Sequence, residues 1–408
     1  MGATPGPLAG TRVLDLVDGF GAYGTRLLAG LGADVIRVEP PGGSSQRSRA
    51  PLWEARRASS AGVAEGTPAA SLYFLHYHAG KRGITLDPGR PAGRALLERL
   101  LDRAEIVIDN GELARLGHDL DALARKRPPL VIVSVTPFGL EGERAGWLGS
   151  DLVCQAMSGM LGLYGYRDER PARWGPEQSS QLSGLAAALG ALIGLWRARR
   201  TGAGERIDIA VERVCALVTF QMQNASLHHQ FGFTRARAPR APGLPSGLYQ
   251  ARDGYVAFNA WRDPEETIAL LAGLGRAGEL SALREALPHA DFLADPRTHA
   301  AIAAFVAEYP RAEFTALAQS HGMIALPVHD ARDLVEDPFL RARGLFVEVE
   351  QPGVERTLLE IGAPVRFGRT PYTPGRRPPL LGEHNVEVYG ELGIDPGELA
   401  RLARDGAV

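Results

Sequence analysis

The stretch that decides the fold is residues 11–40, TRVLDLVDGFGAYGTRLLAGLGADVIRVEP. It opens on a short apolar run, Arg12 to Val17, and closes on a second, Val35 to Glu39. Between them the apolar residues from Thr25 to Leu31 have helical spacing, and Gly32 follows them. The apolar period changes from that of a strand to that of a helix and back. The segment therefore predicts a strand, a turn, a helix and a second strand.

The same alternation continues beyond this segment. Residues 42–67 are polar and are predicted to form a loop. Further elements follow it, with strands predicted at 83–86, 105–108, 130–135 and 206–211, and helices at 91–103, 113–125, 182–200 and 386–392. Strands that alternate with helices imply a mostly parallel sheet covered on both faces. The predicted fold class is therefore α/β.

Length and composition predict two domains in a chain of 408 residues with 45% hydrophobic residues. Residues 225–245 are rich in Arg, Ala and Pro and are interpreted as a linker. Residues 246–330 are predicted to contain a pair of strands and several helices, and are interpreted as a smaller domain. The predicted boundaries are 1–224 for the first part of the large domain, 225–245 for the linker, 246–330 for the small domain and 331–408 for the return to the large domain.

The charge balance indicates which kinds of partner to expect, and the cysteine content indicates the cellular compartment. The 45 basic and 47 acidic side chains leave a formal charge of -2, which does not indicate a nucleic-acid or membrane-surface protein. The two cysteines, Cys154 and Cys215, predict no disulfide framework, and the first residues lack a signal peptide. We therefore expect a cytoplasmic protein. His76 and His78 have strand spacing without a third ligand nearby, so no metal site is predicted.

Gly19, Gly21 and Gly24 fit the pattern G-x-G-x-x-G between a strand and a helix, and Glu39 ends the next strand. This is the pattern of a dinucleotide-binding site. However, Glu39 lies only fifteen residues after Gly24, whereas such sites place their acidic residue about 20 residues on. The glycines therefore favour a tight turn near the phosphates of some ligand, and an NAD- or FAD-dependent oxidoreductase is the weaker alternative.

Several islands of sequence, in order along nearly the whole chain, resemble the class III CoA-transferases, also called the CaiB/BaiF family. The islands include Pro7-Leu8-x-Gly10-x-x-Val13-Leu14-Asp15, Leu31-Gly32-Ala33-Asp34-Val35-Ile36-Arg37-Val38-Glu39-Pro40-Pro41-Gly42, Gly80-Lys81-Arg82, Asp151-Leu152-Val153, Thr201-Gly202-x-Gly204 and Pro379-Leu380-Leu381-Gly382-Glu383-His384. The family includes formyl-CoA transferase, carnitine-CoA transferase and α-methylacyl-CoA racemase. The resemblance implies a Rossmann-like large domain made from both ends of the chain, a smaller middle domain and an interlocked homodimer. It also implies an acyl-CoA and a carboxylic acid as substrates, with no metal and no NAD.

The resemblance also assigns residues to the site. Leu86, Asn110, Arg115 and Leu116 fall on positions that contact CoA in the family. The arginine that usually follows the second strand is replaced by Pro40, and Arg47 in the next loop is the candidate to supply the missing charge.

The catalytic positions depart most from the family. The family's nucleophilic aspartate, which carries the acyl group as a mixed anhydride, corresponds to Ser180, and the histidine of the racemase branch corresponds to Ser150. A serine needs a neighbouring base, and its ester is far less reactive than an anhydride. Ser180 is also interpreted as a possible helix N-cap. Glu177 is a candidate to replace the lost carboxylate, or else a first-turn residue favoured by the helix dipole.

Three hypotheses follow. The chain transfers CoA between carboxylic acids, or acts on an acyl-CoA by a modified mechanism. Alternatively, it is a catalytically silent CoA-binding subunit paired with an aspartate-bearing paralogue. The third hypothesis is the dinucleotide-dependent oxidoreductase.

Overall fold

The computed structural model describes residues 5–53, 70–218, 221–234, 237, 246–259, 277–288, 292, 295–352, 354, 357–373 and 376–408. The chain divides into two compact units. The larger comprises Met1–Tyr164, Ala172–Arg235 and Phe339–Val408, and the smaller Gly165–Pro171 and Ala236–Pro338. Each unit is described by itself below.

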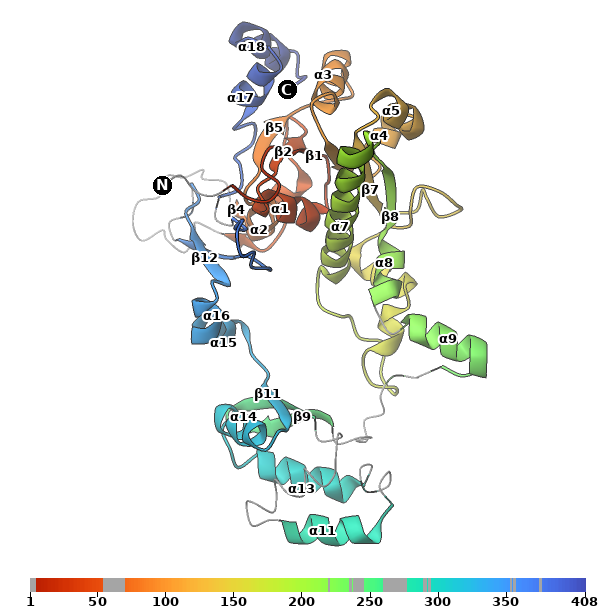
Figure 1. The fold of residues 1–408 in the computed structure, drawn as a ribbon, viewed down its shortest axis with the longest axis vertical. Coiled ribbons are helices and arrows are strands. Elements are labelled where there is room, and N and C mark those ends of the chain that lie inside the picture. The colour runs from red at the N-terminus through yellow and green to blue at the C-terminus, as the bar shows by residue number, and fades with distance from the viewer. Residues whose placement is uncertain are drawn as a thin grey trace. The chain divides into compact units, whose positions relative to one another are not determined.

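The larger unit is built on a six-stranded sheet (Figure 1). Its strands, in chain order, are β1 (Arg12–Asp15), β2 (Asp34–Glu39), β5 (Arg82–Thr85), β6 (Ile106–Asp109), β7 (Val131–Thr136) and β8 (Arg206–Ala210). They lie in the order β5-β2-β1-β6-β7-β8, and every neighbouring pair is parallel. Counted along the chain this order is 3-2-1-4-5-6, the order of a doubly wound nucleotide-binding fold. The predicted α/β class with a parallel sheet is confirmed.

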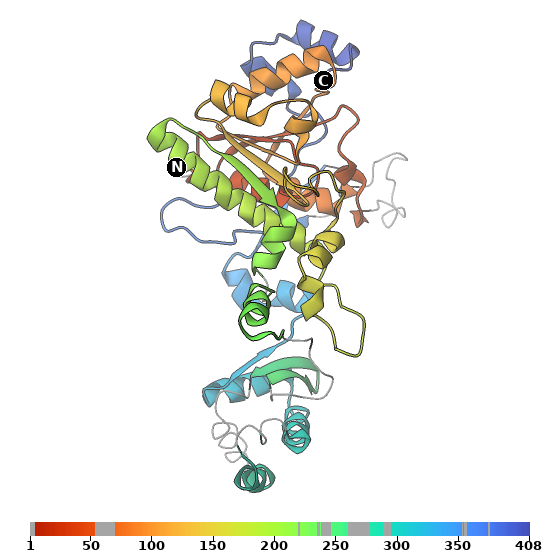
Figure 2. The same cartoon turned by 90° about the vertical axis from the view of Figure 1, so that its right-hand side faces the viewer.

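Alternate residues of the strands enter two separate cores, because successive side chains of a strand point to opposite faces. Val13 of β1 packs in the first core with α1 (Ala22–Gly30) and α7 (Gln178–Thr201). Leu14 packs in the second core, on the other face of the sheet. The second core is covered by α3 (Pro91–Leu101), α5 (Leu120–Lys126), α17 (Asn385–Glu391) and α18 (Pro396–Arg404). The layers are visible in Figures 1 and 2.

The glycines of the G-x-G-x-x-G pattern have structural reasons of their own. Gly21 is the N-cap of α1, with a φ of 92° that favours glycine. Gly24 faces α7, where an added Cβ would lie 2.4 Å from the carbonyl oxygen of Gly184. The pattern therefore combines a tight turn with a close helix crossing, which accounts for it without a dinucleotide.

The C-terminal segment returns to this unit and packs against β5. Asn385 Oδ1 accepts a hydrogen bond from the backbone N–H of Thr85 at 2.9 Å, and the Tyr389 hydroxyl donates to the Thr85 carbonyl oxygen at 2.7 Å. The backbone N–H of Gly83 donates to His384 Nδ1 at 3.1 Å. Both ends of the chain thus contribute to the larger unit.

Several predicted elements differ from those observed. The helix predicted at 113–125 is two helices, α4 (Glu112–Arg115) and α5, because Gly117 between them has a φ of 84°. His76 and His78 lie on a helix, α2 (Leu72–His78), so their strand spacing was misleading. In the predicted loop 42–67, Ser45–Ser48 form the 3-10 helix η1 and Leu52–Trp53 form β3, which pairs with β4 (Ala70–Ser71); residues 54–67 lie outside the described residues.

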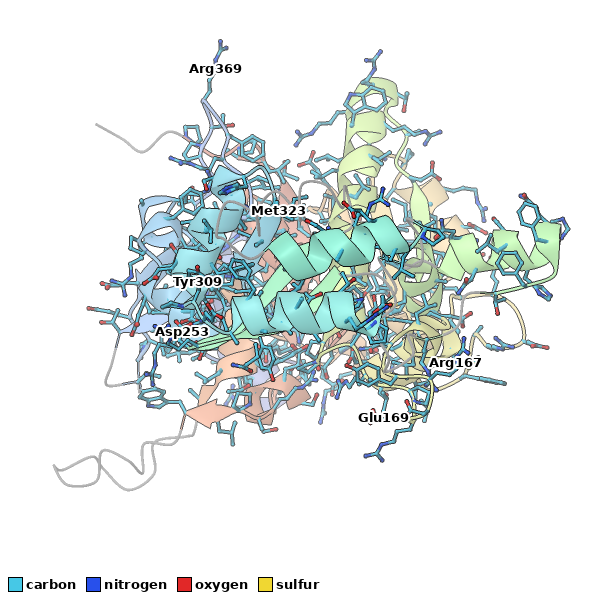
Figure 3. All side chains as sticks on the ribbon, turned by 90° about the horizontal axis from the view of Figure 1, so that it is seen from below. Arg167, Glu169, Asp253, Tyr309, Met323 and Arg369 are labelled. Atoms are coloured by element: carbon cyan, nitrogen blue, oxygen red, sulfur yellow. The ribbon has the colours of Figure 1, made fainter. Side chains whose placement is uncertain are left out.

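The smaller unit contains an antiparallel sheet of β9 (Ser246–Ala251), β10 (Gly254–Asn259) and β11 (Ile324–Pro327). The predicted strand pair is therefore present. Helices α13 (Pro296–Val306) and α14 (Arg311–Ser320) supply residues to its core, and α11 (Ala277–Ala286) and α15 (Ala331–Glu336) also belong to this unit. Arg237 donates hydrogen bonds to the carbonyl oxygens of Arg167 and Glu169, which joins the short segment 165–171 to this unit. Arg167 and Glu169 are labelled in Figure 3.

The predicted linker falls partly on a helix, since α9 (Gln221–Phe231) includes its first residues, and residues 238–245 lie outside the described residues. The remaining described elements are α6 (Asp151–Met157), the 3-10 helix η3 (Met160–Leu163), α8 (Val211–Val218), α16 (Pro338–Ala342), β12 (Phe346–Val349) and β13 (Leu358–Ile361).

Among the described helices, α7 alone is long and apolar enough to cross a membrane by length and composition. Half of its apolar window is buried within the chain, which is also a property of core helices.

Candidate active site

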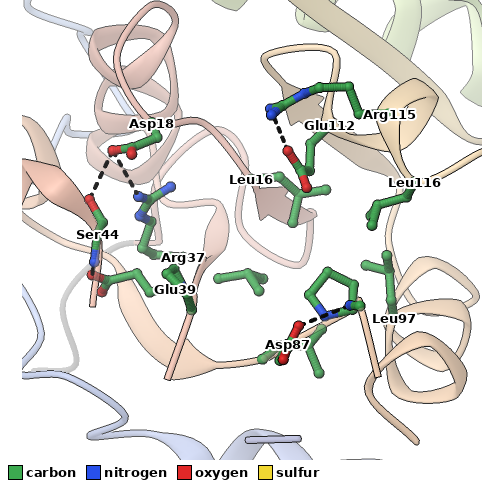
Figure 4. A pocket seen from close by; sticks show the side chains of 15 residues that line it. Leu16, Asp18, Arg37, Glu39, Ser44, Asp87, Leu97, Glu112, Arg115 and Leu116 are labelled. Carbon is green, nitrogen blue, oxygen red and sulfur yellow. Dashed lines mark hydrogen bonds and ion pairs between the residues drawn. The ribbon is translucent and has the colours of Figure 1, made fainter. Parts of the chain in front are cut away.

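A pocket of about 480 Å³ lies beyond the carboxyl ends of β1, β2 and β5 (Figure 4). It is lined by Leu16, Asp18, Arg37, Val38, Glu39, Pro40, Ser44, Leu86, Asp87, Pro88, Gly89, Leu97, Glu112, Arg115 and Leu116. In open parallel sheets, ligands bind at this edge, near the point where the strand order reverses. The order here reverses at β1, which pairs with both β2 and β6. The pocket is therefore where the topology predicts a ligand.

Three of the five predicted CoA-contacting residues line this pocket. Leu86 follows β5 and is 1% exposed, and Leu116 follows α4. The Arg115 side chain is 69% exposed and pairs with Glu112, which also lines the pocket. An arginine at the rim of an apolar slot is suited to a phosphate group, because its guanidinium can donate two parallel hydrogen bonds. The pocket thus offers both an apolar wall and a cation.

The side chains of the other two predicted CoA-contacting residues, Arg47 and Asn110, form hydrogen bonds with other residues of the protein. Arg47 donates from Nε and Nη2 to the two carboxylate oxygens of Glu39, each at 2.7 Å, and its guanidinium lies 4.0 Å above the Phe74 ring. Asn110 Nδ2 donates to the carbonyl oxygens of Phe20 and Val135, both at 2.8 Å. Arg47 therefore holds the end of β2, and Asn110 holds the turn before α1.

The Glu39–Arg47 pair also bears on the dinucleotide hypothesis. In a dinucleotide site the acidic residue after the second strand binds the ribose hydroxyls. Both Glu39 oxygens accept from Arg47, and Oε2 also accepts from the backbone N–H of Ser44 at 3.1 Å. Both oxygens already have partners within the protein and the Glu39 side chain is fully buried, so the geometry argues against that alternative.

A buried polar network fixes the elements on which the pocket rests. Lys81 Nζ donates to Asp15 Oδ2 and to Thr25 Oγ1, both at 2.7 Å, and lies 2.9 Å from His78 Nδ1. His78 Nε2 lies 2.8 Å from Gln46 Oε1, in the segment after β2 that helps to line the pocket. Asp15, His78 and the side chain of Lys81 are fully buried.

The protonation states in this network follow from burial and charge. Burial, with a smaller contribution from Lys81, holds the pKa of His78 well below its ordinary value. Burial likewise lowers the pKa of Lys81 to about 8, although Asp15 opposes this shift. Burial alone would raise the pKa of Asp15, but the charges of Lys81 and Arg37 outweigh it and the pKa is lowered. Neutral His78 can thus accept from Lys81 at one ring nitrogen and donate to Gln46 from the other.

Arg37 is a pocket residue that the sequence prediction missed. It is 1% exposed on β2, and its guanidinium approaches Asp15 at 3.5 Å and Asp18 at 4.0 Å. Its Nε atom is buried without a hydrogen-bond partner among the described residues. An arginine between the apolar residues of a parallel strand, Ile36 and Val38, was the signal that could have identified it.

A second group of functional candidates surrounds the first turn of α7. Asp151, the first residue of α6, accepts hydrogen bonds from the backbone N–H of Ser179 at 2.9 Å and from that of Glu177 at 3.1 Å. It also binds Arg173 Nη2 at 2.6 Å. Burial by itself raises the pKa of Asp151, but hydrogen bonds from Ser179 and Arg173 outweigh this effect and lower the pKa. An ionised Asp151 therefore holds the start of α7 in place.

The two predicted catalytic serines have different environments. Ser150 is the N-cap of α6, since its side chain accepts from the backbone N–H of Val153 at 3.4 Å. Ser180 is not a cap: α7 begins at Gln178, and Ser180 lies in its first turn, 6% exposed. The N-cap interpretation of Ser180 was therefore wrong. Within the described part of the chain, Ser180 Oγ has no hydrogen-bond partner that could take its proton.

Glu177 occupies the N-cap position of α7 and has an unusual backbone. Its φ of 63° makes it the single non-glycine residue with positive φ among the residues that the structure describes. One carboxylate oxygen pairs with Arg49, and the other, Oε2, is buried without a partner there. Positive φ at a non-glycine residue costs roughly 1 kcal/mol or more and is concentrated at functional sites. Glu177 is therefore the N-cap residue of α7 with a strained backbone, and it is not the first-turn helix residue of the alternative interpretation.

No group of three or more His, Cys, Asp or Glu side chains suited to a metal occurs among the residues described. His76 pairs with Glu360 at 3.3 Å, whereas His78 belongs to the buried network.

The sequence and the fold both match known proteins over almost the whole chain. The model of CoA-transferase family III matches residues 8–385. The chain is 32% identical to succinyl-CoA:(R)-benzylsuccinate CoA-transferase subunit BbsE of Thauera aromatica, over 97% of each chain. It is 31% identical to succinyl-CoA:mesaconate CoA-transferase of Haloarcula marismortui, over 96% of this chain and 98% of the relative.

The solved structures give the same result. The crystal structure of a CAIB/BAIF family protein from Brucella suis covers 95% of this chain with a TM-score of 0.80 and 28% identity, and the match includes all of that chain. Family match, relatives and fold agree, and together they establish that this chain belongs to CoA-transferase family III.

Proposed function

We propose that this chain transfers CoA from succinyl-CoA to another carboxylic acid. The donor is suggested by the names of the two relatives, both of which are described as succinyl-CoA-dependent CoA-transferases. The observation that carries the proposal is the pocket at the switch point of the sheet, where Arg115 lies at the rim beside Leu86 and Leu116. These three residues are proposed to contact CoA. Arg47 and Asn110 are proposed to support the site from behind.

The chemistry needs a nucleophile for the thioester carbonyl, and we assign this role to Glu177. A carboxylate is ionised at neutral pH and needs no base, whereas a serine hydroxyl needs one. Attack by a Glu177 oxygen forms a mixed anhydride and breaks the carbon–sulfur bond, so that CoA leaves as the thiolate. The acceptor carboxylate then attacks the Glu177 carbonyl carbon of this anhydride and releases succinate. The CoA thiolate attacks the acyl carbon of the acceptor in the new anhydride, which forms the acceptor thioester and restores the Glu177 carboxylate. Ser180 lies beside this centre, and Ser150 acts as a helix cap.

Incubating the purified protein with succinyl-CoA and a panel of carboxylic acids tests the proposal. We expect one acid to give its CoA thioester together with an equal amount of succinate and no accumulation of free CoA, as measured by liquid chromatography. CoA should also raise the melting temperature, since a ligand bound only by the native state stabilises it. Hydrolysis to free CoA with every acid, or a thermal shift with NAD and none with CoA, would contradict the proposal.

A catalytically silent subunit remains the second hypothesis, because Ser180 replaces the family's aspartate and the first of the two relatives is named as a subunit. We favour the active enzyme, since the relatives are CoA-transferases and Glu177 supplies a carboxylate. Activity that appears only after an aspartate-bearing paralogue is added would reverse this preference. The proposed compartment is the cytoplasm.

We further propose that two copies of the chain associate through the outer face of α7. Leu185, Leu189, Ile193 and Trp196 repeat at intervals of three or four residues, so they share one face of the helix, and they are between 49% and 62% exposed. A groove of about 790 Å³ between α7, β8 and α8 adjoins this face. Apolar surface of this kind marks protein interfaces.

Light scattering measures the association directly. We expect the mass of a dimer at submicromolar concentration for the wild type. Ile193→Glu should shift the mass towards the monomer, because it would bury an unpaired charge in the interface. A wild-type monomer, or a dimer that Ile193→Glu leaves intact, would contradict this interface.

A further inference from the structure

In the ion pair between Arg49 and Glu177, neither side chain uses all of its hydrogen-bonding atoms. The Arg49 side chain is 41% exposed, and within the described part of the chain Glu177 is its sole carboxylate partner. Its guanidinium lies 4.0 Å above the ring of Tyr73. Glu177 uses one oxygen for this pair and leaves Oε2 buried and unpartnered among the described residues. An arginine fork can bind both oxygens of a carboxylate, so this pair leaves donor capacity unused.

The hydroxyl group of Tyr73, whose ring lies under the Arg49 guanidinium, is a hydrogen-bond donor that a ligand could use. Tyr73 is 8% exposed, and its hydroxyl is buried without a partner among the described residues. Burial, with a contribution from Glu177, raises the pKa of Tyr73, so the hydroxyl keeps its proton. Gln181 Nε2 lies 3.4 Å from the Tyr77 hydroxyl, at the long end of hydrogen-bond range. A buried hydroxyl without a partner is costly, and a ligand oxygen would satisfy it.

Glu177 is also an incomplete partner for Arg49. It gives Arg49 one oxygen, and its other oxygen is buried without a partner among the described residues. An external carboxylate could take both nitrogens of the Arg49 fork. Exchange of one carboxylate for another also keeps the charge around Arg49 constant.

We propose that Arg49 and the Tyr73 hydroxyl bind the free carboxylate of a dicarboxylic substrate, and that Glu177 occupies Arg49 when no substrate is bound. This inference rests on the proposed function and names its substrate class. In the thioester of a dicarboxylic acid one carboxyl group is neutral and the other keeps its charge, so only the second needs a cation. Binding of that carboxylate releases Glu177 from Arg49 and leaves its side chain free at the start of α7, beside Ser180.

Calorimetric titration of the whole protein with succinate and with butyrate tests this site without requiring turnover. The wild type should bind succinate more tightly than butyrate. Arg49→Gln should weaken succinate binding roughly 10- to 100-fold and abolish the preference, because hydrogen bonds to a charged group are the strong ones. Tyr73→Phe should reduce the preference less. Arg144→Gln is a matched control, since Arg144 is 40% exposed and also lies over an aromatic ring, Trp147.

For Glu177→Gln we expect the opposite change in succinate affinity, an increase. It removes the internal competitor, so succinate should bind several-fold more tightly, whereas a purely structural Arg49–Glu177 pair would give weaker or unchanged binding. A wild type without preference for succinate, or an Arg49→Gln variant that keeps the preference, would overturn the inference. Succinate binding through Arg49 without any CoA transfer would refute the proposed function alone. CoA transfer with an unchanged KM for succinyl-CoA in Arg49→Gln would refute the inference alone.

Discussion

Glu177→Gln is expected to lower kcat for CoA transfer by roughly a thousand-fold or more, the loss that follows removal of a nucleophile. The amide that replaces the carboxylate is neutral and does not attack a thioester at a useful rate. Substrate affinity should not fall with it, because the amide also frees Arg49. A loss confined to kcat is therefore the signature of the nucleophile, and steady-state kinetics with succinyl-CoA separates it from a loss of binding.

Two further variants make this result specific. Glu143→Gln is the matched control, since Glu143 is 84% exposed and its ion pair with Arg144 is 3.7 Å long; kcat should be unchanged. Ser180→Ala distinguishes the two candidate nucleophiles. If Ser180→Ala abolishes turnover while Glu177→Gln retains it, the acyl group is carried by the serine and the assignment of Glu177 is wrong. Hydroxylamine added during turnover should modify residue 177 and leave residue 180 unmodified.

Lys81→Met is expected to destabilise the larger unit by about 3–5 kcal/mol, the range for breaking a buried ion pair. The ammonium group of Lys81 lies 2.7 Å from Asp15 Oδ2, and both side chains are fully buried. Without Lys81, Asp15 keeps the Thr25 hydroxyl at 2.8 Å and a more distant contact with Arg37 at 3.5 Å. The remaining negative charge is then poorly compensated. Denaturant-induced unfolding followed by circular dichroism measures the loss.

The double variant Asp15→Leu with Lys81→Met provides the control. Because it removes both charges, it should be more stable than Lys81→Met alone, although by how much depends on how well the new side chains pack. If the double variant loses as much as both single variants together, the two residues act independently and the ion pair does not hold the network.

The positions of the strands could be predicted from the sequence because a buried strand leaves a pattern in consecutive residues. The strands β1, β2, β5, β6 and β7 were predicted to within one or two residues, since buried parallel strands are short, almost wholly apolar runs between turns. The prediction of one continuous helix over 113–125 was wrong, because Gly117 adopts a positive φ that interrupts the helix. The apolar periodicity of the sequence does not detect such an interruption. Similarly, His76 and His78 lie two apart in a helix, where the period-two pattern was accidental.

Leu86, Arg115 and Leu116 were assigned to the site through the family resemblance, and the structure shows that all three line one pocket. Arg47 and Asn110 were also predicted to contact CoA, yet their side chains bind Glu39 and backbone carbonyl groups. Residue type and position do not reveal which partner a long or amide side chain takes.

The sequence by itself determined the α/β class and the family resemblance, and the resemblance predicts that Ser180 stands where the family has its aspartate. Only the tertiary structure decided that Glu177 pairs with Arg49 and that Tyr73 OH is left without a partner among the described residues. Arg49 and Glu177 lie 128 residues apart, and their ion pair joins the end of η1 to the start of α7. Such a contact is set by the packing of distant elements, for which a local pattern carries no signal.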